Sequence, residues 1–493
     1  MKRTTSILCI LAILLSAASC AGKSSVETVP DLSPKAVTDT VETVTENTVQ
    51  ESGVPETFVL DGRDVPILEF KEPTNLSVDL SESTGDTMND AIFLAHQAVM
   101  ERLQCNLAFI DNGGIETGKL ETTYAAGEDA YSLVIGTQWK VAPLVSKHMF
   151  ANLNPDSGGS SVDNYIDLSK PWWYTRYIDE TEVDNSHTYF LAGDASINVM
   201  RRASMLVCNM DLLHSIGGDI DALYDNVLSG NWLWDDFVTM VEGVYIDNTG
   251  DGKKDAGDTF GYATWTRSDV DHLMVDSGIR ACARDDSGVP YLAFNNEKTI
   301  ASVEKVCVLL WKNPGGYYKE QIPVDTMLGE NRLLFVVNKF SGLDSIRDIG
   351  TNYTIIPVPK LDASIGNYSS LVHDDAMIFC VPIQSTQFTA TTAVLEEMSC
   401  QYYNDVIPTY YNVILKAKYR RDGSDKASQI MDILHDSMTT DFAYIYNYAM
   451  GNMIISLRDL IGIKRSTDFV SHYAKNEMKY EDSLAKLIDA IRE

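Results

Sequence analysis

Leu76-Ser-Val-Asp-Leu80 alternates apolar and polar residues with a period of two, which predicts a β-strand. The stretch from Asp86 to Gln104 follows, with apolar residues at helical spacing, and Asp86 or Thr87 stands where a helix N-cap is expected. A strand followed directly by an amphipathic helix is typical of α/β proteins.

The same alternation continues along the chain. Short apolar runs predict strands at Leu133–Gly136, Met205–Cys208, Tyr353–Pro357 and Ala376–Pro382. Trp234-Asp-Asp-Phe237 predicts the start of a helix that runs through Met240, and the final hundred residues are mainly helical in pattern. Strands alternating with helices predict α/β layers built on central sheets.

The N-terminus has the pattern of an export signal. A basic start at Lys2-Arg3 precedes an apolar run from Ile7 to Leu15, and Ala17-Ala-Ser-Cys20 closes it with small residues and a cysteine. The run is too short to span a bilayer as a mature helix. We therefore expect residues 1–19 to be a signal peptide, with Cys20 as the lipidation site and the protein held outside the cytoplasm on the cell membrane. An ordinary signal peptide with a chance cysteine is the alternative.

Residues 21–56 are rich in Ser, Thr, Val and Glu and contain no run of apolar periodicity. Such a composition favours a flexible segment. We expect residues 20–56 to be a lipidated flexible tether.

Composition excludes some partners. The 493-residue chain carries 70 acidic against 39 basic residues, for a net charge of −31. An acidic surface repels nucleic acid and anionic lipid, so neither is expected to bind.

Of the cysteines beyond Cys20, none forms a C-x-x-C pair, and most lie in apolar surroundings. Buried free thiols are expected, although export would permit disulfides.

An acidic loop from Asp247 to Asp258 has the ligand spacing of an EF-hand calcium loop. The ligands would be side-chain oxygens, with a backbone carbonyl from Lys253, and Gly252 stands at the sharp turn. The candidate metal ligands are Asp247, Thr249, Asp251, Lys253, Asp255 and Asp258. Lys254 at position eight and Asp at position twelve depart from the pattern, and an Asp/Gly-rich turn without metal is the alternative. A structural calcium ion is the only cofactor expected, with no organic cofactor.

Aromatic residues cluster in several places. Trp232 and Trp234 flank a helix start and are expected in the core. Trp172, Trp173 and Trp265 lie in loop-like sequence, where an indole face can stack on a sugar ring. These three are the stronger ligand candidates.

Enzymatic function has little support in the sequence. The chain contains no G-x-S-x-G, H-E-x-x-H, Walker or dinucleotide-binding pattern. His373-Asp-Asp375 resembles an acid/base site, but a hydrogen-bonded loop histidine is the simpler interpretation. A pair of glycosidase carboxylates among 70 acidic residues stays open. We expect a protein without catalytic activity.

Several stretches together resemble family 1 extracellular solute-binding proteins of ABC importers, in particular the long lipoprotein members of clostridia. They include Thr84 to Ile92, Tyr165 to Trp173, Trp232 to Phe237 with the acidic loop and Phe260-Gly-Tyr262, Ile356 to Lys360, and Tyr410 to Arg421. The match runs from about residue 75 to 480.

The resemblance implies a two-lobed α/β fold of the type II periplasmic-binding-protein class, with a ligand cleft between the lobes. It places lobe 1 at residues 57–199 with a returning segment at 330–370. Lobe 2 would comprise 200–329 together with the mostly helical 371–493. The cleft is expected at the ends of strands, as in open α/β sheets. The residues expected to bind ligand are Glu82, Ser83, Trp139, Trp172, Trp173, Asp194, Trp265 and His373.

The expected function is capture of a small solute, a sugar or oligosaccharide above others, and its delivery to the permease subunits of an ABC importer. A surface glycan-binding lipoprotein without a transporter is the first alternative. A secreted glycoside hydrolase is the second, from a different class of protein.

Overall fold

A computed structural model describes residues 49–71, 76, 82–155, 163–418 and 425–492. The predicted signal peptide, Cys20 and the tether up to residue 48 lie outside these residues. The strand predicted at Leu76–Leu80 lies outside them too, apart from Leu76 itself. Within the described part of the chain, no helix has both the length and the apolar character needed to cross a membrane.

The first sheet has four strands in the order β12-β3-β1-β2. Its strands are β1 (Arg63–Glu69), β2 (Cys105–Asp111), β3 (Leu133–Thr137) and β12 (Met377–Cys380). β1 pairs in parallel with both β2 and β3, whereas β12 runs antiparallel to β3, with Met377 opposite Thr137. The strands predicted at Leu133–Gly136 and Ala376–Pro382 are confirmed, and both are fully buried. The chain therefore returns to its first sheet after more than two hundred residues.

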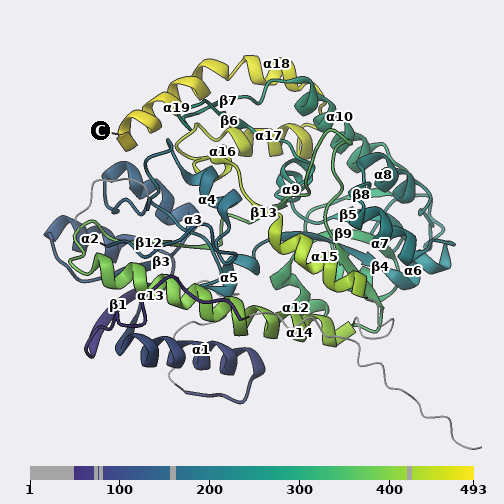
Figure 1. Ribbon diagram of the computed structural model, residues 1–493. Helices are drawn as coiled ribbons and strands as arrows, with labels where there is room; N and C mark the ends of the chain where they lie inside the picture. Colours follow the sequence, from purple (N-terminus) through teal and green to yellow (C-terminus); the bar gives the residue numbers. More distant parts are fainter. Residues whose placement is uncertain (1–48, 72–75, 77–81, 156–162, 419–424, 493) are drawn as a thin grey trace, which may run out of the picture. The chain divides into compact units, whose positions relative to one another are not determined.

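The second sheet has five strands in the order β10-β4-β9-β5-β8. Its strands are β4 (Ser204–Asn209), β5 (Phe260–Thr264), β8 (Gly316–Tyr318), β9 (Leu333–Lys339) and β10 (Tyr353–Ile356). β5 is parallel to β8 and β9, whereas β4 is antiparallel to β9 and β10. The predicted strands at Met205–Cys208 and Tyr353–Pro357 are confirmed. Figure 1 shows the two sheets side by side, the first on the left and the second on the right.

The expected boundaries of the lobes need correction. Residues 330–370 were assigned to lobe 1, but they contribute β9 and β10 to the second sheet. The segment that returns to the first sheet is β12, which lay in the part assigned to lobe 2. An apolar run predicts a strand from its own residues. Its partner strand is fixed by long-range pairing, which the run does not reveal.

Helices fill the connections. Between strands of the first sheet, and from it to β4, are α1 (Thr87–Leu103), α2 (Gly118–Ala126), α3 (Gln138–Val141), η1 (Ala142–Lys147), α4 (Thr175–Thr181) and α5 (Ile197–Met200). The second sheet is connected by α6 (Met210–Ser215), α7 (Ile220–Leu228), α8 (Trp234–Glu242), α9 (Asp269–Val275), the hairpin β6 (Cys282–Arg284) with β7 (Pro290–Leu292), α10 (Glu297–Trp311), α11 (Val324–Gly329), η2 (Phe340–Gly342) and α12 (Leu343–Ile346).

The C-terminal part is mainly helical, as predicted. It contains α13 (Phe388–Gln401), the π-helical turn η3 (Tyr402–Val406), α14 (Ile407–Lys418), α15 (Asp425–Asp436), α16 (Phe442–Ile445), α17 (Met453–Gly462), α18 (Phe469–Ala474) and α19 (Glu477–Arg492). α13, η3 and α14 run below both sheets in Figure 1.

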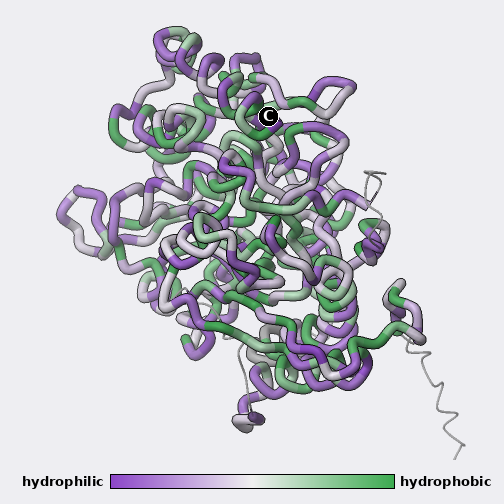
Figure 2. The backbone as a smooth tube through the Cα atoms, turned by 90° about the vertical axis from the view of Figure 1, so that its left-hand side faces the viewer, coloured by the Kyte–Doolittle hydropathy of each residue, from purple (hydrophilic) through white to green (hydrophobic). Residues whose placement is uncertain are grey.

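Local sequence signals explain two of the helices. Asp86 caps α1, because its Oδ1 accepts hydrogen bonds from the backbone N–H of Met88 and Asn89, both at 3.0 Å. α8 begins at Trp234 as predicted, with Trp234 and Phe237 in the core. Hydrophobic segments lie mainly inside the molecule, with hydrophilic segments at its periphery (Figure 2).

The end of the expected tether is packed against the domain. Val54 is buried, Ser52 Oγ donates to Glu397 of α13, and the backbone N–H of Gln50 donates to Asn404 Oδ1 at 3.0 Å. Residues 49–56 are therefore held by side-chain contacts, although their composition predicted a flexible segment.

Three crossing segments, residues 201–204, 370–373 and 437–441, join the two lobes. A bridge pairs Ala203 with Val372, and β11 (Ser370–Leu371) pairs in parallel with β13 (Met438–Thr439). Asp276 of the second lobe is fully buried and binds two of them. Its carboxylate accepts from Ser204 Oγ and from the backbone N–H of Leu371, both at 2.6 Å. The crossing segments thus form one hydrogen-bonded ribbon.

Candidate ligand-binding site

A cavity of about 970 Å³ lies where the two sheets meet. Trp265, which directly follows β5, and Lys339, which ends β9, line it from the second sheet. Asp375 lines it from just before β12, and Leu76 comes from the connection after β1. Because β12 is antiparallel to β3, its start lies at the edge where the parallel strands of the first sheet end. The cavity therefore sits at the carboxyl ends of the parallel strands, where open α/β sheets bind ligands.

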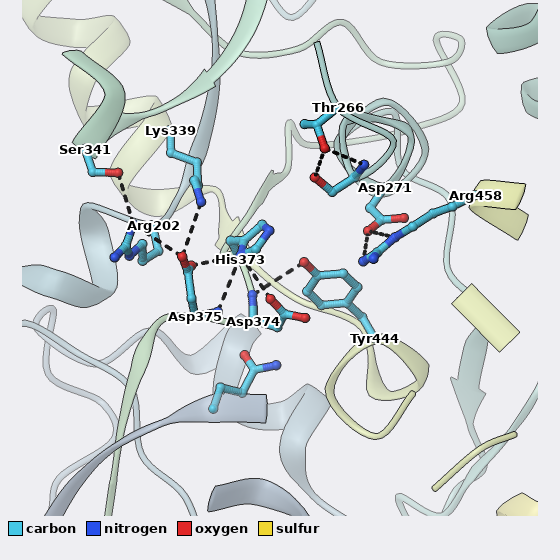
Figure 3. Close-up of polar contacts among 12 residues, drawn as sticks. Arg202, Thr266, Asp271, Lys339, Ser341, His373, Asp374, Asp375, Tyr444 and Arg458 are labelled. Carbon is cyan, nitrogen blue, oxygen red and sulfur yellow. Dashed lines mark hydrogen bonds and ion pairs between the residues drawn. The ribbon is translucent and has the colours of Figure 1, made fainter. Parts of the chain in front are cut away.

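Asp375 is surrounded by three basic side chains at the cavity wall (Figure 3). His373 Nδ1 lies 2.8 Å from its Oδ1, while Arg202 Nη1 and Lys339 Nζ lie 3.3 Å and 3.4 Å from its Oδ2. These bases come from two crossing segments and from β9, so the cluster connects the ribbon to the second sheet. The Asp375 carboxylate is consequently already well supplied with donors.

The charges of this cluster fix its protonation. Burial opposes the charged form of His373, but hydrogen bonds and charges from Asp374 and Asp375 outweigh it and raise the pKa of His373 to about 9. Burial likewise opposes ionisation of Asp375, yet His373, Lys339 and Arg202 hold its pKa well below the usual range. The site therefore contains a histidinium between two carboxylates at neutral pH.

His272 packs against His373 with ring centroids 5.9 Å apart. Burial, assisted by the positive charges of His373, Lys339 and Arg458, holds the pKa of His272 well below its usual value. One imidazole of the pair is thus charged and the other neutral. The neighbouring Arg458 donates from Nε to the buried Asp271 carboxylate at 2.6 Å and lies over the Tyr444 ring, 5.9 Å from its centroid.

Three predicted residues lie at or near the cavity. Trp265 lines it with 43% of its surface exposed, which suits a stacking platform. His373 stands in the polar cluster beside it. Trp139 follows β3, donates its backbone N–H to the Asp374 carbonyl at 3.1 Å and contacts the exposed ring of Tyr448, with centroids 6.3 Å apart. The two tryptophans therefore follow strands of different sheets.

Trp172 and Trp173 are core residues, contrary to the prediction. Trp172 is 0% and Trp173 4% exposed, and Trp173 Nε1 donates to Glu396 at 3.0 Å. Gly193 approaches so closely that a Cβ there would lie 2.4 Å from the Trp172 carbonyl oxygen. Both rings are therefore buried, although the sequence around them is loop-like. Trp232 and Trp234, which were predicted to lie in the core, are buried as well.

Asp194 does not line the cavity either. It is fully buried, accepts a hydrogen bond from the Tyr174 hydroxyl and lies 3.4 Å from His435 Nε2. Glu82 and Ser83 are exposed just before α1 and do not line the cavity. A position just after a strand correctly placed Trp265 at the cavity. The same reasoning failed for Asp194, Glu82 and Ser83.

The acidic loop folds around its own backbone. Asp247 Oδ2 accepts from Gly252 N–H at 2.9 Å, and Gly252 has a φ of +72°, which favours glycine. Asp258 is buried and accepts from the N–H groups of Asn248 and Asp255, both at 3.1 Å. Among the described residues, no three His, Cys, Asp or Glu side chains are grouped as a metal site. Calcium binding stays a prediction.

The free-thiol prediction for the described cysteines is confirmed, since each is unpaired and all but Cys105 are buried.

Sequence reasoning missed the basic residues of the site. Arg201-Arg202 directly before a buried strand, and Lys339 at the end of another, were signals for them. Arg458 and Tyr444 come from the helical C-terminal part, and their sequence gives no sign of a site.

The chain matches no protein-family model. No curated protein matches it.

Solved structures show the same fold at low identity. UspC of Mycobacterium tuberculosis has a TM-score of 0.56 at 12% identity, covering 85% of this chain and 100% of its own. An ABC transporter solute-binding protein of Thermotoga lettingae, bound with α-D-tagatose, has a TM-score of 0.52 at 12% identity, covering 87% and 100%.

The galacto-N-biose/lacto-N-biose I-binding protein of an ABC transporter from Bifidobacterium longum has a TM-score of 0.52 at 12% identity, covering 88% of this chain and 99% of its own. At this identity the likeness concerns the fold alone. The chain has the two-lobed, type II α/β fold of periplasmic solute-binding proteins, and the similar structures named here include binding proteins whose ligands are sugars.

Proposed function

We propose that the protein is a family 1 extracytoplasmic solute-binding protein that captures a sugar or oligosaccharide without transforming it and delivers it to the permease of an ABC importer. The observation that carries the proposal is the cavity of about 970 Å³ at the meeting edges of the two sheets, with Trp265 exposed on its wall. A volume of this size suits a small solute. Sugars bound by proteins of the same fold give the ligand class.

The chemistry of the wall supports a polar ligand. Trp265 offers an apolar face for ring carbons, and Asn338, Ser341, Ser345 and Thr326 offer amide and hydroxyl groups. The charged residues that line the cavity balance in number: Arg201, Arg202 and Lys339 are basic, and Asp325, Asp344 and Asp375 are acidic. Arg201 Nη2 lies 2.7 Å from Asp344 Oδ2. A ligand with many hydroxyls fits such a wall without adding an unbalanced charge.

Ligand would stabilise the approach of the two lobes, because only a closed arrangement lets it touch both sides at once. The N-terminal Cys20 would carry a lipid that retains the protein at the membrane near the permease. Closure on the ligand and retention by a lipid are both part of the proposal.

A thermal-shift screen against sugars, amino acids and short peptides tests the proposal. A ligand that binds the native state raises the melting temperature by mass action. We expect a rise with one or more sugars and none with the other classes. A rise with amino acids or peptides alone would contradict the sugar assignment.

A further inference from the structure

A second cavity, of about 370 Å³, lies beside the crossing segments and shares no lining residue with the cavity of about 970 Å³. Its walls come from both lobes. Arg176 of α4 lines it from the first lobe, and Val227 and Leu228 of α7 line it from the second. Tyr368 and Ser437 line it where two crossing segments begin. α15 packs against α7, and β13 packs against α4, so these elements lie together (Figure 1).

Arg176 brings a positive charge to this wall without a carboxylate of its own. Its Nη1 donates to the Tyr368 carbonyl at 3.0 Å and its Nη2 to Ser369 Oγ at 3.1 Å, and it forms no ion pair with any described residue. Arg280, which lies 3.9 Å from Glu180, donates from Nη2 to the same Ser369 hydroxyl at 3.1 Å. Burial and the charge of Arg280 outweigh the opposing charge of Glu180 and lower the pKa of Arg176. An anion in the cavity would offset this repulsion.

Lys360 places a second positive charge beside the same wall. The residue is 4% exposed, and its Nζ donates to the Gly366 carbonyl at 3.3 Å and lies 5.4 Å from the centre of the Tyr368 ring. A Cβ on Gly230 would lie 3.7 Å from the same Nζ. Gly230, Gly366 and Tyr368 all line the cavity. Lys360 forms no ion pair within the described part of the chain, and burying a cation without a counter-ion is costly. Its position therefore favours an anion on the other side of this wall.

The nearby carboxylates do not cancel these charges. Asp436 lines the cavity, but its Oδ1 lies 3.3 Å from His435 Nδ1, and His435 Nε2 lies 3.4 Å from buried Asp194. Burial opposes the charged form of His435, but Asp194 and Asp436 outweigh it and raise the pKa of His435 to about 10. Together with Arg176 and Lys360, three cations thus stand against two carboxylates. One negative charge in the cavity would balance the surplus.

Much of the remaining wall is apolar. Val227 and Tyr368 are buried, whereas Leu228 and Ile433 are half-buried and so have surface left for a ligand. Asn367, which is exposed, adds an amide group. A cation at one point and aliphatic side chains elsewhere suit a small organic acid, because its carboxylate and its hydrocarbon part each find a matching surface.

We infer that this cavity is a second binding site, which takes a small organic monocarboxylate with an apolar body. The carboxylate accepts from the remaining N–H groups of Arg176, in the charge-assisted pairing that guanidinium groups favour. The apolar body lies against Leu228 and Ile433. A phosphate dianion exceeds the single surplus charge and is repelled by Asp436. The site goes beyond the proposed function and does not depend on it.

Ligand-detected NMR titration of the wild-type protein with hexanoate and benzoate begins the test. Hexanamide and benzamide keep the apolar body without the charge, and they should bind at least about tenfold more weakly than the acids. Acetate, which keeps only the charge, and inorganic phosphate should also bind more weakly. If neither acid binds, or if acid and amide bind equally, the inference is wrong.

Two exposed wall positions locate the bound acid. Asn367→Asp adds a negative charge to the wall, and Asp436→Asn removes one; both side chains are exposed, so both variants should fold. Affinity for the acid that binds should fall about threefold in the first variant and rise by a similar factor in the second. Unchanged affinity in both would place the acid elsewhere and overturn the inference.

Arg176→Gln removes the proposed carboxylate partner and should weaken binding roughly tenfold to a hundredfold. Arg63→Gln, at the exposed first residue of β1, is the matched control and should bind as the wild type does. A folded Arg176→Gln protein with wild-type affinity would contradict the inference. Should that variant fail to fold, the opposite shifts in Asn367→Asp and Asp436→Asn decide the question.

Discussion

His373 and Asp375 are joined by a hydrogen bond of 2.8 Å between Nδ1 and Oδ1, at the point where a crossing segment enters the first sheet. Lys339, at the end of β9 in the second sheet, approaches the other oxygen of the same carboxylate. Asp375 is therefore bound by the crossing segment on one side and by the second lobe on the other. The site and the ribbon between the lobes share these residues, so their electrostatics affect both ligand binding and stability.

The raised pKa of His373, about 9, predicts a stability that falls at alkaline pH. Its contribution is fully present below about pH 6.5, the usual pKa of histidine, and is lost as the pH rises through about 9. The loss is at most roughly 3 kcal/mol. Urea unfolding of the wild type should show this fall between pH 6 and 9, and His373→Gln should remove much of it. Equal pH dependence of both proteins would contradict the assignment.

Trp172 should be required for folding stability. Its side chain is fully buried, so Trp172→Ala should lower the free energy of unfolding by about 3–5 kcal/mol. The half-exposed Trp265 provides the comparison, since Trp265→Ala should leave the melting temperature close to that of the wild type. Denaturant unfolding of both variants checks this. A stable Trp172→Ala protein would count against the core assignment.

The loop from Asp247 to Asp258 is predicted to bind calcium as a structural ion, because oxygen donors at this spacing suit a hard cation. Chelator should lower the melting temperature of the wild type, and Asp251→Ala should abolish that effect. Asp251 is the better probe, since it is exposed whereas Asp258 is buried and bonded to the loop backbone. Asp235→Ala serves as control. If calcium and chelator leave the wild type unchanged, the loop is a metal-free turn.

Cys20 is predicted to carry the lipid anchor. Cys20→Ala should release the protein into the medium or leave it unprocessed, because no thiol is then available for lipidation. Fractionation of cells that express either form, with Cys105→Ala as control, measures the outcome. Membrane retention of the Cys20→Ala protein with normal processing would exclude the lipobox.

Local patterns predicted the elements well, because they depend on neighbouring residues. The α1 helix with its Asp86 cap, the buried strands β3, β4, β10 and β12 and the start of α8 all follow from periodicity and capping. Which sheet a strand joins depends on long-range pairing. That is why the segment 330–370 was placed in the wrong lobe.

The site was predicted only in part. Trp265 and His373 follow or precede strands at the edge where the cavity lies, so their positions carried a signal. Trp172 and Trp173 have a similar loop-like context, but burial of a loop depends on what packs over it, and here Gly193 lets the chain close on them. Tyr444 of α16 packs against His373, and Arg458 of α17 lies over the Tyr444 ring. Spacing along the sequence does not reveal that these distant residues meet.

Calorimetric titration of Trp265→Ala beside the wild type tests the central claim most directly. The sugar is the one that raises the melting temperature of the wild type. If the cavity between the sheets holds the sugar against this indole, the variant should stay folded and bind roughly thirtyfold more weakly, a loss of about 2 kcal/mol. Unchanged affinity in a folded Trp265→Ala protein would contradict the account and place the sugar elsewhere.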